Sequence, residues 1–237
     1  GCRFCASGLL KVKRKLLANE MLGQVMAFDR YLKEKDSSLG VTHVVIMGTG
    51  EPFDNYDNVL SFIRTLNSPF GLNIGARHIT VSTCGVVPGI LRFGKEGLQV
   101  NLAISLHAPN DELRDMLMPI NRAYPLEELI PAIIQYGKDS GGRRVTYEYI
   151  LIKGVNDSID CAKELYKLIS PTFGYVNLIP YNPVMENGFE RSLDGQVELF
   201  HEYLLSKHIK STIRKEFGSD IDAACGQLRA KYAKRGK

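Results

Sequence analysis

The sequence predicts an α/β protein built around a parallel β-sheet. Short runs rich in Val, Ile and Leu alternate along the chain with stretches in which apolar residues recur at helical spacing. Repeated strand-then-helix units give parallel strands joined by right-handed crossovers. Polar and glycine-containing segments directly follow the strand-like runs, as ligand-binding loops do in such folds. No low-complexity linker or repeat divides the 237 residues, so we expect a single domain over residues 1–237.

The predicted strands are short apolar runs bounded by turn residues, as buried parallel strands are. In chain order they are Val41–Met47, His78–Ser82, Val100–Ser105, Val145–Ile152, Val176–Ile179 and Ser211–Arg214. The predicted helices are Ala18–Lys35, Asn58–Leu66, Val87–Phe93, Leu126–Tyr136, Ile159–Leu168 and Gly195–Ser206. Pro131 has no backbone N–H to donate, so we expect it in the first turn of its helix or at a kink.

The composition is typical of a globular protein without a membrane segment. Hydrophobic residues make up 44% of the chain and charged residues 24%. No apolar run approaches the roughly 20 residues that cross a bilayer, and no secretory signal is visible, so we expect a cytoplasmic location. The five cysteines are an odd number, which argues against a disulfide framework and for a reducing compartment.

Basic residues cluster near both ends of the chain, although the net charge of +4 is mild. One cluster spans Lys11–Lys15 and the other spans Arg229–Lys237. Such clusters either form solvated surface or neutralise the phosphates of a nucleic acid. Charge alone leaves both interpretations open.

The first candidate site is the pair Cys2 and Cys5, because the spacing C-x-x-C lets two sulfurs converge on one metal site. Alone, this spacing fits zinc, a redox-active dithiol or an iron–sulfur cluster. Zinc would need a second ligand pair, but Cys84 and Cys161 lie far apart in strand and helix patterns. Zinc is therefore poorly supported, and we expect Cys84 and Cys161 to be buried, inert thiols.

A glycine-rich turn, Met47–Phe53, follows the first predicted strand. Its glycines let the backbone approach a ligand closely, and Glu51 could hold a cationic amine. The turn is not G-x-G-x-x-G and no Walker lysine follows it, so a nucleoside triphosphate is not favoured.

Polar side chains also lie at or after the ends of three other predicted strands. Ser82, Ser105, His107 and Asn182 should therefore project over one rim of the sheet, where they could hydrogen-bond one small polar ligand. Each alone is more often a loop cap, and it is their convergence on one rim that supports a binding site. Near the C-terminus, Cys225 lies among small residues that leave its thiol sterically open, and a buried structural cysteine is the alternative.

Eight segments, in this order along the chain, together resemble the RlmN branch of the radical S-adenosylmethionine (SAM) methyltransferases. They are Cys2–Cys5, Gly50–Pro52, Ser82–Pro88, Ser105–Asp111, Met118–Asn121, Val155–Asp157, Asn177–Pro183 and Asp220–Leu228. The resemblance covers essentially the whole chain. It implies a partial (βα)6 radical-SAM barrel with a C-terminal extension.

The resemblance also implies the site residues. Cys2 and Cys5 match two ligands of a [4Fe-4S] cluster, whose third cysteine would lie upstream of Gly1. The positions that match the family's SAM-binding residues are Gly50, Glu51, Ser82, Ser105, Leu106, His107 and Asn182.

Cys225 matches the cysteine that the family methylates during turnover. By resemblance, a radical from a second SAM molecule removes hydrogen from that S-methyl group, and the resulting carbon radical adds to C2 of an adenine. A second cysteine, expected upstream of Gly1, then releases the product through a transient disulfide bond with Cys225.

The implied substrate is an adenosine in the peptidyl-transferase region of large-subunit rRNA and, for some members, the adenosine beside the tRNA anticodon. RNA bases are read when they are unstacked, and the basic clusters then gain a reason to contact RNA. The implied electron donor is a flavodoxin or ferredoxin. We expect a monomer with no membrane partner.

Two alternatives accompany this interpretation. The relative Cfr methylates C8 of the same adenine and confers antibiotic resistance, but Gly50–Pro52 and Ser105–Pro109 favour the C2 pattern. The other alternative is an RNA-binding fragment without catalysis, because the family's accessory RNA-binding domain and first cluster cysteine are missing. We expect the 237-residue fragment alone to be inactive and unable to keep a stable cluster.

Overall fold

The computed structural model describes residues 1–9, 12–184 and 187–215. Its centre is a six-stranded sheet in which each strand pairs in parallel with the next, in the order β1-β2-β3-β4-β5-β6. The strands are β1 Val44–Ile46, β2 Ile79–Thr83, β3 Asn101–Ser105, β4 Val145–Leu151, β5 Gly174–Pro180 and β6 Ser211–Ile213. All six predicted strands and the α/β class are confirmed, with ends that differ by a few residues.

The described residues also form seven α-helices and four short 3₁₀ helices, of which one α-helix and one 3₁₀ helix precede the first strand. The α-helices are α1 Ala18–Lys35, α2 Tyr56–Asn67, α3 Val87–Gly94, α4 Asp111–Leu117, α5 Leu126–Asp139, α6 Ile159–Ile169 and α7 Asp194–Ser206. The 3₁₀ helices are Ala6–Leu9, Pro52–Asn55, Ala76–His78 and Pro119–Arg122. Six of the α-helices match predicted ones, whereas α4 was not predicted. Pro131 lies inside α5, beyond its first turn.

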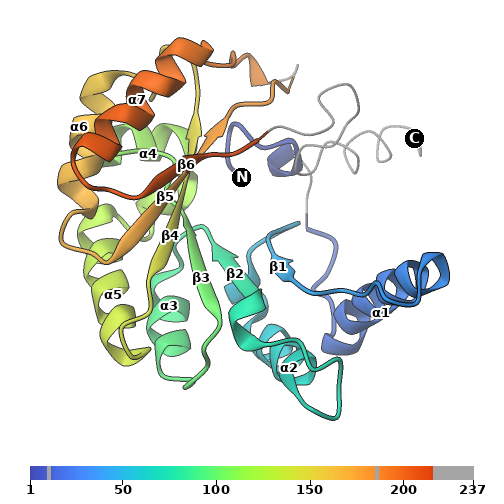
Figure 1. Cartoon of the computed structure of the whole chain (residues 1–237). Helices are drawn as coiled ribbons and strands as arrows, with labels where there is room; N and C mark the ends of the chain where they lie inside the picture. The colour runs from blue at the N-terminus through green and yellow to red at the C-terminus, as the bar shows by residue number, and fades with distance from the viewer. Residues whose placement is uncertain (10–11, 185–186, 216–237) are drawn as a thin grey trace.

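The helices cover one face of the sheet. Crossovers of a single hand place successive helices on the same side of consecutive parallel strands. Figure 1 shows α3, α5, α6 and α7 along this face, whereas the N-terminal segment, residues 1–9, lies on the other side of the sheet. No helix in the described ranges has the length and apolar character that a membrane span requires.

Two apolar clusters result from this arrangement. The main core packs the sheet against the helices and includes Tyr147 and Tyr149 of β4. A second, smaller cluster contains Leu117, Met118 and Ile150, and the N-terminal segment packs against it. Because side chains alternate along a strand, β4 serves both clusters and supports the N-terminal loop at its carboxyl end.

Candidate active site

The N-terminal loop that carries Cys2 and Cys5 lies at the carboxyl edge of the sheet. Two backbone hydrogen bonds shape it, from the Cys5 N–H to the Cys2 carbonyl (3.2 Å) and from the Gly8 N–H to the Cys5 carbonyl (3.0 Å). A third bond, from the Arg3 N–H to the Leu117 carbonyl (2.9 Å), fixes the loop to the end of α4. The two cysteines are therefore held on a short, anchored loop.

The chemistry of this loop fits two ligands of an iron–sulfur cluster. Cys2 and Cys5 are free thiols, and soft sulfur ligands suit such clusters. Burial is the main cause that raises the pKa of Cys2, so a bound metal would have to displace its proton. The Ser7 hydroxyl is buried without a hydrogen-bond partner in the described part of the chain, so it is available to donate to a cluster sulfur. The described residues hold no group of three or more His, Cys, Asp or Glu side chains arranged for a metal.

Glu51 joins the loops that follow β1 and β2. One carboxylate oxygen accepts a hydrogen bond from the Phe53 N–H (3.0 Å) and caps the 3₁₀ helix, while the other accepts from the Cys84 N–H (2.8 Å). Gly50, directly before it, has a φ of +124°, and an added Cβ there would meet no atom within 4 Å. The carboxylate is thus fixed in place, and each oxygen keeps a lone pair for a ligand amine.

Ser82 and Ser105 lie on the sheet face that is turned away from the main core. In β2 and β3 the residues beside them, Val81 and Ile104, belong to the main core, so alternation places the two serines on the opposite face. Ser82 is paired in register with Ala103, which lies two residues before Ser105 and on the same face of the sheet. Within the described residues neither serine hydroxyl has a hydrogen-bond partner, which leaves both available to a ligand.

His107 is a buried, neutral imidazole that contacts the cysteine loop. Its ring lies 4.9 Å from the ring of Phe4, edge to face, and Phe4 stands between the two cysteines. Its Nδ1 accepts a hydrogen bond from the Ile150 N–H (3.1 Å), so the proton of the neutral ring lies on Nε2. Burial, assisted by the charge of Arg114, lowers the pKa of His107 to about 3.

Asn156 holds the unusual backbone of His107, whose φ is +57°. The fully buried Asn156 amide donates to the carbonyls of His107 (2.8 Å) and Ile150 (2.7 Å) and accepts from the Ile152 N–H (2.8 Å). Leu106 is also fully buried, and its N–H donates to the Glu148 carbonyl (3.0 Å). The turn after β3 is therefore tied to the end of β4.

Sequence reasoning missed two residues at this edge. Cys84, which was expected to be a buried, inert thiol, packs near Cys2, and the sequence did not indicate this position. Burial together with Glu51 raises its pKa, which keeps the thiol protonated. Arg114 of α4 is fully buried, and its Nη2 donates to the Cys84 carbonyl (2.7 Å). A charged residue in a short polar helix gives no sequence signal of burial, so only the long-range contacts reveal it.

The other predicted positions are less closely connected. Asn182 is half-buried, two residues after β5, at the same edge of the sheet. Cys225 and the basic stretch Arg229–Lys237 lie outside the described residues. In the first basic cluster, Arg14 forms a bidentate ion pair with Glu20 of α1 (2.7 Å for both bonds), which is a structural role.

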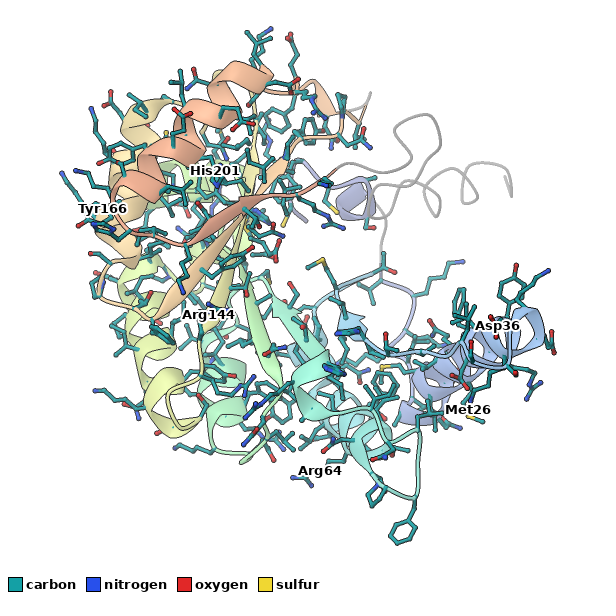
Figure 2. All side chains as sticks on the ribbon, viewed as in Figure 1. Met26, Asp36, Arg64, Arg144, Tyr166 and His201 are labelled. Atoms are coloured by element: carbon teal, nitrogen blue, oxygen red, sulfur yellow. The ribbon has the colours of Figure 1, made fainter. Side chains whose placement is uncertain are left out.

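The side chains far from this edge belong to the surrounding framework. Figure 2 places the labelled Tyr166 and His201 on the helices that cover the outer face, and Met26 and Asp36 on and just after α1. Arg144 lies directly before β4, at the amino edge of the sheet (Figure 2). The candidate site is thus confined to the carboxyl edge.

The chain is similar to known proteins in sequence and in fold. A sequence profile of the Radical SAM superfamily matches residues 1–169. A probable dual-specificity RNA methyltransferase RlmN from Spiroplasma citri is 56% identical over 97% of this chain and 65% of its own length. A protein of the same name from Enterococcus faecalis is 53% identical over 100% of this chain and 67% of its own length.

A solved structure is similar to this chain in both fold and sequence. The crystal structure of a radical SAM methyltransferase from Sphaerobacter thermophilus matches with a TM-score of 0.91 and 48% identity, over 97% of this chain and 67% of that one. The chain thus spans about two thirds of the length of its relatives. From the profile match, the identity and the shared fold, the chain belongs to the radical SAM superfamily and, within it, to the RlmN family.

Proposed function

We propose that the full-length protein methylates C2 of an adenosine in large-subunit rRNA, and of the adenosine beside the tRNA anticodon, with a [4Fe-4S] cluster and SAM. One observation carries this proposal: Phe4, between the two cysteines, contacts the ring of His107 among the polar strand ends. The names of the relatives support an RNA substrate. The flavodoxin or ferredoxin donor, the monomeric state, the cytoplasmic location and the single core domain stay predictions.

Each polar group at the edge has a role in this proposal. Glu51 would accept the amino group of SAM on a carboxylate that two backbone N–H groups already orient. The hydroxyls of Ser82 and Ser105 would hydrogen-bond the cofactor, with Gly50, Leu106 and Asn182 contributing from their loops. His107 would donate from Nε2, because its Nδ1 is already an acceptor.

The cysteine loop would hold the cluster in an apolar surrounding. When bound, the cluster supplies an electron to SAM, and SAM supplies the methyl group. Cys2 and Cys5 would bind two irons, and the second apolar cluster beneath them, with Leu117 and Ile150, would limit access of water. Cys225 would carry the methyl group to the RNA base.

The activity can be tested with the full-length protein, purified and reconstituted without oxygen. We expect it to form 2-methyladenosine in rRNA and tRNA fragments, detected after digestion to nucleosides by chromatography that separates the 2-methyl and 8-methyl isomers. Cys225→Ala should abolish the product, whereas Cys161→Ala, a cysteine buried in α6, should keep it. Absence of methyladenosine from the wild type, equal activity of Cys225→Ala, or stoichiometric zinc without a brown chromophore would contradict the proposal.

Binding of SAM provides a second test at Glu51. Glu51→Gln removes the charge that would pair with the amine, so we expect the affinity for SAM to fall by about 1.5–3 kcal/mol, or roughly 10- to 150-fold. Equilibrium binding to the reconstituted protein measures this change. Glu112→Gln, at an exposed position of α4, is the control and should bind SAM normally. Equal affinities of wild type and Glu51→Gln would remove Glu51 from the site.

A further inference from the structure

We propose that Arg114 is a positioning residue whose buried positive charge makes the cluster on Cys2 and Cys5 easier to reduce. This inference rests on the proposed function, because it requires the cluster. No motif singled out Arg114, and it reaches the site from α4, beneath the cysteine loop.

The guanidinium of Arg114 connects two loops and a 3₁₀ helix. Its Nη2 donates to the Cys84 carbonyl (2.7 Å) after β2, and its Nε donates to the Leu106 carbonyl (3.2 Å) after β3. Its Nη1 donates to the Asn121 side-chain oxygen (2.7 Å) in the 3₁₀ helix after α4. All three nitrogens of this fully buried guanidinium thus donate a hydrogen bond, so its charge has a fixed position.

The charge of Arg114 is not cancelled by a direct ion pair. No carboxylate in the described ranges forms a salt bridge with it. The nearest negative groups are one amide away, since Asn121 Nδ2 donates to Asp111 (2.8 Å) and Asp115 (2.9 Å). Both aspartates are more solvent-accessible than Arg114, so water screens them more strongly than it screens the guanidinium.

The charge lies next to the cluster ligands. Cys84, whose carbonyl Arg114 binds, packs with Cys2 on the same apolar cluster. The helix that carries Arg114 also anchors the cysteine loop, through the bond from the Arg3 N–H to the Leu117 carbonyl. The charge of Arg114 is thus held at the same edge of the sheet as the cysteine loop, by the helix that anchors this loop.

Reduction adds one electron to an already negative group. Three thiolates and a [4Fe-4S] core of charge 2+ sum to a net charge of −1, and the reduced state has a net charge of −2. A nearby cation in a low-dielectric surrounding stabilises the reduced state more than the oxidised one. Removal of the Arg114 charge should therefore make the cluster harder to reduce.

The test is a redox titration of the cluster in the reconstituted full-length protein, followed by electron paramagnetic resonance. At the potential that half-reduces the wild type, we expect Arg114→Met to show at least a tenfold lower ratio of reduced to oxidised cluster, about 59 mV for one electron. Arg114→Lys, which keeps the charge, should shift the ratio less. Asp115→Asn removes a counter-charge and still offers an oxygen to Asn121, so the ratio should rise at least twofold.

Controls separate this inference from the proposed function. Asp139→Asn makes the same charge change at the end of α5, at the amino edge of the sheet, and should leave the ratio unchanged. A wild type that binds no cluster overturns the proposed function, and the inference with it. If the wild type binds its cluster normally, but Arg114→Met and Asp115→Asn both show the same ratio of reduced to oxidised cluster as the wild type, the inference alone is overturned. If Arg114→Met does not retain a cluster, Arg114→Gln decides, because it keeps an N–H donor without the charge, and a ratio equal to that of the wild type then overturns the inference.

Discussion

Asn156→Ala is expected to destabilise the protein by about 3–5 kcal/mol. The fully buried amide makes three hydrogen bonds, to the carbonyls of His107 and Ile150 and from the Ile152 N–H. Each bond contributes roughly 1 kcal/mol net, and each buried group left without a partner costs about 1–3 kcal/mol. Alanine removes all three bonds and leaves an N–H and two carbonyls unpaired. The expected loss in the free energy of unfolding is therefore near the upper end of the range that single substitutions cause.

Urea unfolding of the full-length protein without cofactors, followed by far-UV circular dichroism, measures this loss. The control is Asn19→Ala, at an exposed position in the first turn of α1, where a change within about 0.5 kcal/mol is expected. Because the backbone of His107 depends on the same amide, Asn156→Ala should also weaken SAM binding in the reconstituted protein. If the free energy of unfolding falls by less than 1 kcal/mol with an unchanged m-value, the three hydrogen bonds do not contribute to stability as expected.

Two other substitutions test the packing and the protonation state. An added Cβ at Gly89 of α3 would lie 2.6 Å from the Phe53 side chain, so Gly89→Ala should cost about 1–3 kcal/mol and lower the Tm in calorimetry. His107 has a pKa of about 3 in the folded protein and 6.5 as its ordinary value, so the unfolded chain binds more protons between these values. Its contribution to stability is complete above pH 6.5 and is lost as the pH falls toward 3, by up to about 1.36 kcal/mol per pH unit. His107→Asn should flatten the stability curve in this window.

Each of these tests has its own control. Gly23→Ala, at a position of α1 with no atom within 4 Å of an added Cβ, should raise stability by up to about 1 kcal/mol, so a similar loss at both glycines would contradict steric overlap at Gly89. Asparagine tolerates the positive φ at position 107 and can accept a bond from the Ile150 N–H, so the variant should fold. An unchanged pH slope in that variant would show that His107 is protonated in the folded protein.

The strands and most helices could be predicted because their pattern is local. In the strands around Leu102 and Tyr147, apolar residues recur at alternate positions on the face that packs against the main core, whereas the other face carries Ser105 and Glu148. The short α4 has no such pattern: four of its seven residues are charged, and the Asn110 side chain that caps it also fits a turn. Local periodicity cannot distinguish such a helix from a loop.

The network behind the site could not be predicted from the sequence, because each of its members depends on distant partners. Asn156 lies in one of the segments that carried the family resemblance, but its three bonds reach β4 and the loop after β3. Arg114 and Cys84 meet only once β2 and α4 are in place. A single sequence gives an arginine in a polar helix the properties of a surface residue, and only the fold reverses that expectation.

Because all six strands run parallel, their amino ends lie at one edge of the sheet and their carboxyl ends at the other, and this gives the protein a surface that experiments can modify. The loop between α5 and β4 lies at the amino edge and contains Gly141 and Gly142, where an added Cβ would meet no atom within 4 Å. A short insertion or a chemical label in that loop would be remote from the cysteine loop and from every polar strand end. It offers an attachment point for immobilising or labelling the protein that leaves the carboxyl edge unmodified.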